Sequence, residues 1–153
     1  MIRPHTGLMT PDPRPPVSRP RRWLVPLAAT AVVLGVLDAL WISLVARGLY
    51  EDGLGDLLAD PVVGWAAGVF YVVYAVAVTV LVVRPELDRG TTGTAAAKGA
   101  VLGVAAYATF GFTDLAIVQG WPVRLAVVDT VWGGVLTAAT AAAAHAASRR
   151  VGA

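Results

Sequence analysis

Four long apolar runs occupy most of the chain, and three of them contain an aspartate well inside the run: Asp38, Asp114 and Asp129. The runs cover residues 23–46, 62–83, 95–119 and 123–145. About 20 apolar residues in a helix cross a hydrocarbon core of about 30 Å. Only helices and closed barrels satisfy their own backbone hydrogen bonds in lipid, and the runs lack the alternation of barrel strands. We therefore expect an all-α integral membrane bundle of four transmembrane helices.

The composition agrees with this class and excludes others. Of the 153 residues, 57% are hydrophobic and 14% are charged, whereas soluble domains are about one quarter charged. The chain has no cysteine, which excludes disulfides and thiolate metal sites. No nucleotide loop, nucleophile elbow or zinc motif is present, so we expect no cofactor. A net charge of +2 is too small to indicate nucleic acid as a partner.

The basic residues predict the orientation in the membrane. Residues 1–22 are rich in proline and arginine and predict a disordered cytoplasmic tail, followed by a transmembrane domain at 23–147 and a second tail at 148–153. Ten of the twelve basic residues lie in the tails or beside the loop between the second and third runs. Positive charge collects on the cytoplasmic side, so both termini are expected there. The arginine-rich, alanine-rich composition is typical of a bacterium, hence a plasma membrane.

Counting along the helices puts the three aspartates at a similar depth. Each lies about 5 to 9 residues from the outer end of its run, roughly 8 to 13 Å below the surface. A carboxylate costs several kcal/mol in hydrocarbon and is a functional hypothesis by default. We predict an outward-facing polar site lined by Asp38, Asp114 and Asp129. The alternative is that they only fix helix packing, by hydrogen bonds or by a pair with Arg124, although Arg124 is expected to reach toward the outer surface.

The first and fourth runs share a four-residue pattern, Asp38 to Trp41 and Asp129 to Trp132. Residues three apart share a helix face, so each indole N–H is expected to reach toward its own carboxylate or to cover it from lipid. The pattern also fits a relic of inverted repetition between antiparallel helices. His145, at the end of the last run, is expected at the membrane interface.

Small and polar residues recur at helical spacing on the other runs, and such faces allow close helix approach inside a bundle. The stripes are Gly64, Gly68, Tyr71 and Ala75; Gly99, Gly103, Tyr107 and Asp114; and Asp129, Gly133, Leu136 and Thr140. Trp121 and Pro122 mark a tight turn, which predicts that the third and fourth helices are antiparallel neighbours. Residues 51–60 alternate acids with leucines and predict a short amphipathic segment on the outer surface.

The chain resembles an uncharacterised family of bacterial four-helix membrane proteins, domain of unknown function 2177. The similarity covers about residues 37–145. It rests on Asp38 to Trp41, on the segments at 70–75 and 107–116, and on Gly-Trp-Pro at 120–122 followed by 128–133. In the family pattern an aspartate stands at the position of Gly111 and an asparagine at that of Asp114, so the role of Asp114 stays open. The resemblance implies the topology and a shared polar site, and it supplies no activity.

The candidate ligand-binding set combines the residues above. It consists of Asp38, Asp114, Asp129, Trp41, Trp132, Tyr71, Tyr107, Thr113 and Arg124. For the tryptophans and tyrosines, core or interface packing is the stronger interpretation. The leading hypothesis is a non-enzymatic membrane protein, in contact with lipids, that binds a small or lipid-like molecule at this site or assists a membrane partner. One alternative is a proton- or cation-coupled transporter, working as a homodimer through the Gly64/Gly68 or Gly99/Gly103 stripe. The other is an intramembrane lipid-modifying enzyme with an aspartate acid–base pair.

Overall fold

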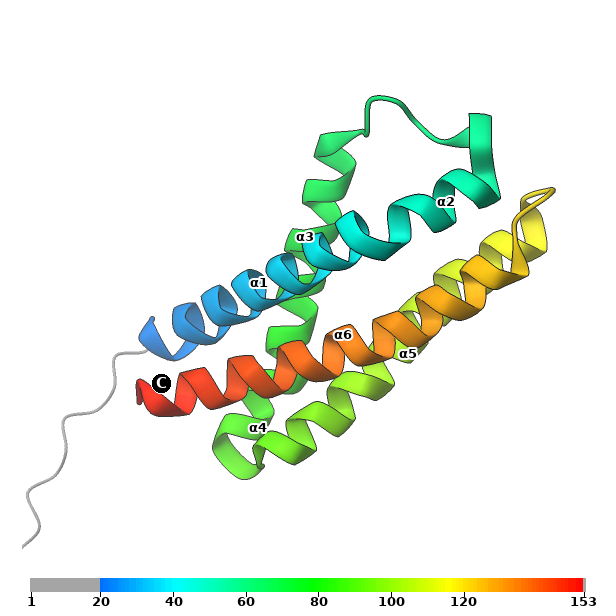
Figure 1. The fold of residues 1–153 in the computed structure, drawn as a ribbon. Helices are drawn as coiled ribbons and strands as arrows, with labels where there is room; N and C mark the ends of the chain where they lie inside the picture. The colour runs from blue at the N-terminus through cyan, green and yellow to red at the C-terminus, as the bar shows by residue number, and fades with distance from the viewer. Residues whose placement is uncertain (1–19, 153) are drawn as a thin grey trace, which may run out of the picture.

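The computed structural model describes residues 20–152, and all regular structure in this part of the chain is helical (Figure 1). Residues 1–19 of the expected tail lie outside the described residues. The elements are α1 (Arg21–Trp41), the π-helical turn η1 (Ile42–Ala46), α2 (Arg47–Leu54), the 3-10 turn η2 (Gly55–Leu57), α3 (Gly64–Val78), the π-helical turn η3 (Thr79–Val83), α4 (Arg84–Arg89), α5 (Thr92–Ile117) and α6 (Val123–Arg150).

Four continuous helical segments are long and apolar enough to cross a membrane. They are Arg21–Leu57, Gly64–Arg89, Thr92–Ile117 and Val123–Arg150. Large apolar side chains cover the outside of the bundle, among them Leu44 and Val101, which are 78% and 71% exposed. Extended apolar surface of this kind marks contact with a membrane or another apolar partner. The expected all-α fold with four spanning helices is thus confirmed.

Helix α6 lies at the centre of the arrangement, with α1 along one side and α5 packed antiparallel to it on another (Figure 1). Helix α3 crosses α1 at a steep angle, and α4 turns the chain back toward α5. The Arg21 guanidinium donates a hydrogen bond to the Val151 carbonyl oxygen at 2.7 Å. The start of α1 and the end of α6 therefore lie at the same end of the bundle.

Glycines let α5 and α6 approach so closely that backbone touches backbone. A Cβ added to Gly103 would lie 2.0 Å from the carbonyl oxygen of Gly133, and one added to Gly99 would lie 2.6 Å from that of Thr137. A Cβ on Gly133 would lie 2.2 Å from the Tyr107 ring. The stripes predicted on the third and fourth runs do meet, and the tight turn makes these helices neighbours. Gly99 and Gly103 are therefore used within one chain, which is a correction to their proposed role as dimer contacts.

The stripe on the second run behaves differently. A Cβ added to Gly64 or Gly68 would meet no atom within 4 Å, whereas Tyr71 and Ala75, further along α3, pack inward. The prediction that this whole stripe faces the bundle is wrong for the two glycines. Since α3 crosses its neighbours at a steep angle, its first turns lie outside the contact zone (Figure 1).

The first spanning helix is longer than its apolar run. It continues from α1 through η1 into α2, so residues 47–54 extend the same helix, and the segment expected at 51–60 is not a separate surface element. On its exposed side Arg47 donates to Glu51 at 2.8 Å, an i,i+4 pair. The extension carries Tyr50 toward α6, where its hydroxyl becomes part of the site.

Candidate functional site

Asp38 ties three helices together. It lies on the buried face of α1, which repeats every four residues through Thr30 and Leu34, and it is 6% exposed. The Tyr71 hydroxyl on α3 donates to Oδ2 at 2.7 Å, and the Trp132 indole N–H on α6 donates to Oδ1 at 3.0 Å. Both carboxylate oxygens are thus hydrogen-bonded, and both donors are neutral.

The two tryptophans pair with each other across the helices. The rings of Trp41 and Trp132 stack with centroids 4.4 Å apart and an interplanar angle of 9°. The indole N–H of Trp132 reaches Asp38 on the other helix, so the expectation that it reaches its own Asp129 is wrong. Because α1 and α6 are adjacent and antiparallel, Trp132 lies opposite Asp38. The stacking of Trp132 on Trp41 and its hydrogen bond to Asp38 therefore both join α6 to α1.

Asp129 is held by a residue that the sequence did not single out. It is 7% exposed on α6, and the Tyr50 hydroxyl of α2 donates a hydrogen bond to its Oδ2. Near the end of an apolar run, a tyrosine is usually assigned to the membrane interface. No sequence pattern pointed to this contact, because the apolar run was expected to end at residue 46 and Tyr50 lies beyond it. Helical side chains lean toward the N-terminus of their helix, which brings Tyr50 back toward the site.

The remaining predicted residues occupy the margin of this site. Asp114 is half-buried on α5, and its side chain has no hydrogen bond or ion pair within residues 20–152. Thr113 and Arg124 are exposed, and Arg124 forms no ion pair in the described part of the chain. The structure therefore gathers Asp38 and Asp129 with their donors and leaves Thr113 and Arg124 outside.

Tyr107 and Tyr74 extend the aromatic lining inward. The Tyr107 ring packs on Gly133 and meets the Tyr74 ring edge-on, with centroids 6.1 Å apart. The Tyr74 hydroxyl lies 2.6 Å from the Thr137 hydroxyl, and both residues are buried. Polar groups thus continue from Asp38 into the bundle core.

An apolar groove of about 290 Å³ runs between α1 and α3 and reaches the donor of Asp38. Its lining residues are Leu27, Ala31, Leu34 and Gly35 on α1 and Tyr71, Val72, Ala75 and Val76 on α3. Gly35 has open space beside it, since a Cβ there would meet nothing within 4 Å. At this end of the groove Tyr71 both lines the wall and bonds Asp38.

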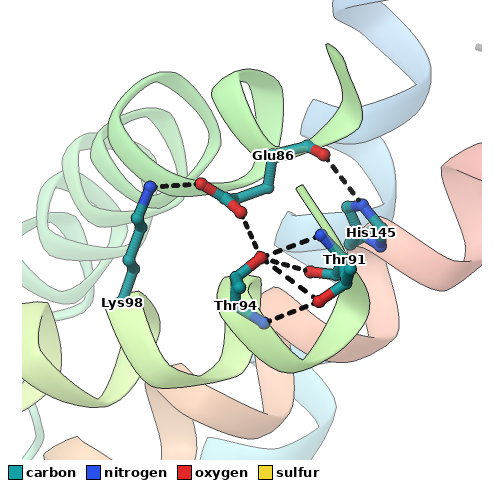
Figure 2. Close-up of polar contacts among 5 residues, drawn as sticks. All are labelled: Glu86, Thr91, Thr94, Lys98 and His145. Atoms are coloured by element: carbon teal, nitrogen blue, oxygen red, sulfur yellow. Dashed lines mark hydrogen bonds and ion pairs between the residues drawn. The ribbon is translucent and has the colours of Figure 1, made fainter. Parts of the chain in front are cut away.

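A second polar cluster lies at the other end of the bundle (Figure 2). Lys98 and the Thr94 hydroxyl donate to the carboxylate of Glu86, which is 4% exposed. His145 is fully buried, with Nε2 3.1 Å from the Glu86 carbonyl oxygen and Nδ1 3.0 Å from the Thr92 hydroxyl. His145, expected at the membrane interface, is enclosed by the protein because α4 folds over the end of α6.

Glu86 lies beyond residue 83, where the apolar run ends. The hydrogen bond from Lys98, aided by that from Thr94, lowers the pKa of Glu86 below its ordinary value. Sequence reasoning missed Glu86 because an acid near Arg84 and Arg89 fits a solvated loop. Among the described residues, no group of three histidines or acids is arranged to hold a metal ion.

Comparison with known proteins adds one finding. No curated protein and no solved structure matches the chain. A family model described as a predicted membrane protein (DUF2177) matches residues 23–146. The matched stretch includes Asp38, Asp129 and nearly all of the four long helices, so the chain belongs to this family of predicted membrane proteins.

Proposed function

We propose that this is a bacterial plasma-membrane protein, with both termini in the cytoplasm, that binds a single-chain amphiphilic amine. Its apolar chain lies in the α1–α3 groove and its amino group lies at Asp38. The role is one of binding rather than catalysis. The observation that carries the proposal is the junction at Tyr71, where an apolar groove meets the hydroxyl that bonds a buried carboxylate.

The head group is inferred from the carboxyl group of Asp38 and its surroundings. Its two hydrogen-bond donors, Tyr71 and Trp132, are neutral, and no basic side chain of residues 20–152 forms an ion pair with it. A buried charge without an opposite charge is costly in a low-dielectric interior. An ammonium group compensates this charge. The stacked Trp41 and Trp132 rings add an aromatic surface of the kind that binds organic cations.

The apolar chain of the ligand is inferred from the groove. The groove volume of about 290 Å³ is just below the usual range for ligand pockets, about 300–1,000 Å³, which fits one alkyl chain better than a two-chain phospholipid. In the proposed orientation, Asp38 is in the outer half of the membrane, just above the midpoint of the run at 23–46, and the groove beside Leu27 to Gly35 runs from there across the midplane toward the cytoplasmic side. The apolar chain of the ligand would therefore extend inward from Asp38.

Native mass spectrometry of the purified protein with dodecylamine tests the proposal. We expect wild type to retain one dodecylamine, Asp38→Asn to lose it, and Gly35→Leu to lose it because the leucine fills the groove. Gly68→Leu is the matched control: this helical glycine is also open on the same measure, but it does not line the groove.

Dodecanol and dodecanoate define the head-group specificity in the same assay. We expect dodecanol to bind more weakly than the amine and dodecanoate not to bind, because Asp38 repels a second carboxylate. Equal retention of dodecylamine by wild type and Gly35→Leu, or equal retention of dodecanoate and dodecylamine, contradicts the proposal.

A further inference from the structure

Buried polar side chains run through the core of the bundle between the Asp38 site and the Glu86 cluster. These buried residues are Thr30, Asp38, Thr79, Glu86, Asp129, Thr137, Thr140, His145 and Ser148. The apolar residues around them, such as Leu34, Val78 and Leu136, are fully buried. A polar line inside an apolar bundle is costly in lipid and therefore points to a function.

Two hydroxyls midway along this line lack partners. The α1–α6 register follows from two contacts, Asp38 with Trp132 and Arg21 with Val151. This register places Thr30 opposite Thr140. Both side chains are fully buried, and neither hydroxyl has a hydrogen-bond partner in the described chain. An unpaired buried hydroxyl costs about 1–3 kcal/mol, and in native proteins such groups commonly bind internal water.

We propose that this line conducts protons across the bundle, between Asp38 and Asp129 at one end and His145 and Glu86 at the other. The hydroxyls of Tyr74 and Thr137 lie 2.6 Å apart below the aspartates, and Thr137 also donates to the carbonyl oxygen of Gly133. Internal water would have to join this pair to the aspartates. Thr140 follows Thr137 by about 4.5 Å of helix rise. This gap is too long for a direct hydrogen bond and suits one bridging water.

The inner end of the line contains a group that can take up and release the proton. His145 lies two to three helical turns beyond Thr137 on α6, and its Nδ1 is 3.0 Å from the Thr92 hydroxyl. Either ring nitrogen of an imidazole can bind a proton or donate one. Glu86 and Lys98 belong to the same cluster (Figure 2). The exposed Arg149 follows His145 by four residues on α6. Thr92 is exposed, so a proton at this point can pass to water.

The proton balance is simple. A proton from water joins an aspartate carboxylate, each hydroxyl or water along the line accepts one proton and gives up another, and His145 or Glu86 returns one to water. Only O–H and N–H bonds change, and one positive charge crosses per cycle. This inference is independent of amine binding, because it rests on the core hydroxyls rather than on the groove.

Flux measurement in vesicles tests this proposal. The protein is reconstituted into phosphatidylcholine–phosphatidylglycerol vesicles containing pyranine, and valinomycin with a potassium gradient sets the membrane potential. We expect wild type to change the internal pH faster than protein-free vesicles do. Thr140→Val should lower this rate at least tenfold. Thr109→Val, which removes an exposed hydroxyl bonded only to its own helix, is the matched control and should conduct like wild type.

Stability separates a broken path from a broken fold. Because Thr140→Val removes a buried hydroxyl that has no partner, it should unfold at the same temperature as wild type or higher. A wild-type rate equal to that of protein-free vesicles overturns the proposal, and so does a Thr140→Val rate equal to wild type. Gly35→Leu should conduct protons at the wild-type rate when no amine is present. Failure of the amine-binding proposal can therefore be told apart from failure of the proton-conduction proposal.

Discussion

The contact between α5 and α6 makes a sharp quantitative prediction for Gly103→Ala. The new methyl carbon would lie 2.0 Å from the Gly133 carbonyl oxygen and 2.6 Å from the Gly133 carbonyl carbon. An ordinary contact begins at about 3.4 Å, so the two helices must separate locally by more than about 1 Å. Both obstructing atoms belong to the backbone, and no side-chain rotation can relieve the overlap.

The size of the effect follows from two opposing contributions. Overpacking a core costs about 1–3 kcal/mol. Opening a gap of about 0.5–1 Å between α5 and α6 also removes about a quarter to a half of the dispersion energy of each contact between them. We expect the upper end, about 3 kcal/mol, because the obstacle is rigid. Alanine is favoured over glycine in a helix by up to about 1 kcal/mol. The net loss in the free energy of unfolding should be about 2 kcal/mol.

SDS titration of the protein in mixed micelles measures this difference, followed by far-ultraviolet circular dichroism. Gly68→Ala is the matched control, since it makes the same change in a helix where the methyl meets nothing within 4 Å. We expect it to be neutral or slightly stabilising. If Gly103→Ala and Gly68→Ala unfold at the same SDS fraction, the close contact between α5 and α6 is refuted.

Three further predictions concern the polar clusters. Trp132→Phe keeps an aromatic ring but removes a donor to Asp38, and it should lower the free energy of unfolding by about 1–3 kcal/mol in the same titration; an unchanged midpoint would disprove the cross-helix bond. Tyr50→Phe should destabilise by a similar amount, because Asp129 loses its donor, and equal stability would count against that contact. The lowered pKa of Glu86 predicts a stabilising contribution that is present above the ordinary glutamate pKa and lost as pH falls through the lowered value. Glu86→Gln should remove this acid dependence from thermal unfolding in detergent, and an identical acid profile would contradict it.

The spans and the α5–α6 contact could be predicted from the sequence because they depend on local regularities. The lengths of the apolar runs predict the four spanning helices, and the four-residue spacing of Gly99 and Gly103 puts both on the face of α5 that meets Gly133. The same regularity failed for Gly64 and Gly68. A helical stripe says which residues share a face, but the crossing angle of α3 decides how much of that face contacts another helix.

The partners of the aspartates could not be predicted, because they depend on the register between helices. Trp132 was expected to serve Asp129 three residues away, yet it bonds Asp38 across the bundle. Tyr50 was not among the predicted site residues and His145 was expected at the interface, and both are hydrogen-bonded parts of the polar clusters. Depth along a helix follows from residue counting, whereas neighbours across helices follow only from packing.

Asp38 is shared by both proposals, and this sharing has a physical consequence. The groove leads from Asp38 along the outside of α1 and α3, while the hydroxyl line leads from it into the core beside α6. A single carboxylate in a low-dielectric site compensates one positive charge well and a second one poorly. An ammonium bound at Asp38 and a proton on Asp38 therefore exclude each other. If both proposals hold, dodecylamine should slow the part of the proton flux that enters through Asp38 in wild type but not in Gly35→Leu, while entry through Asp129 would remain open.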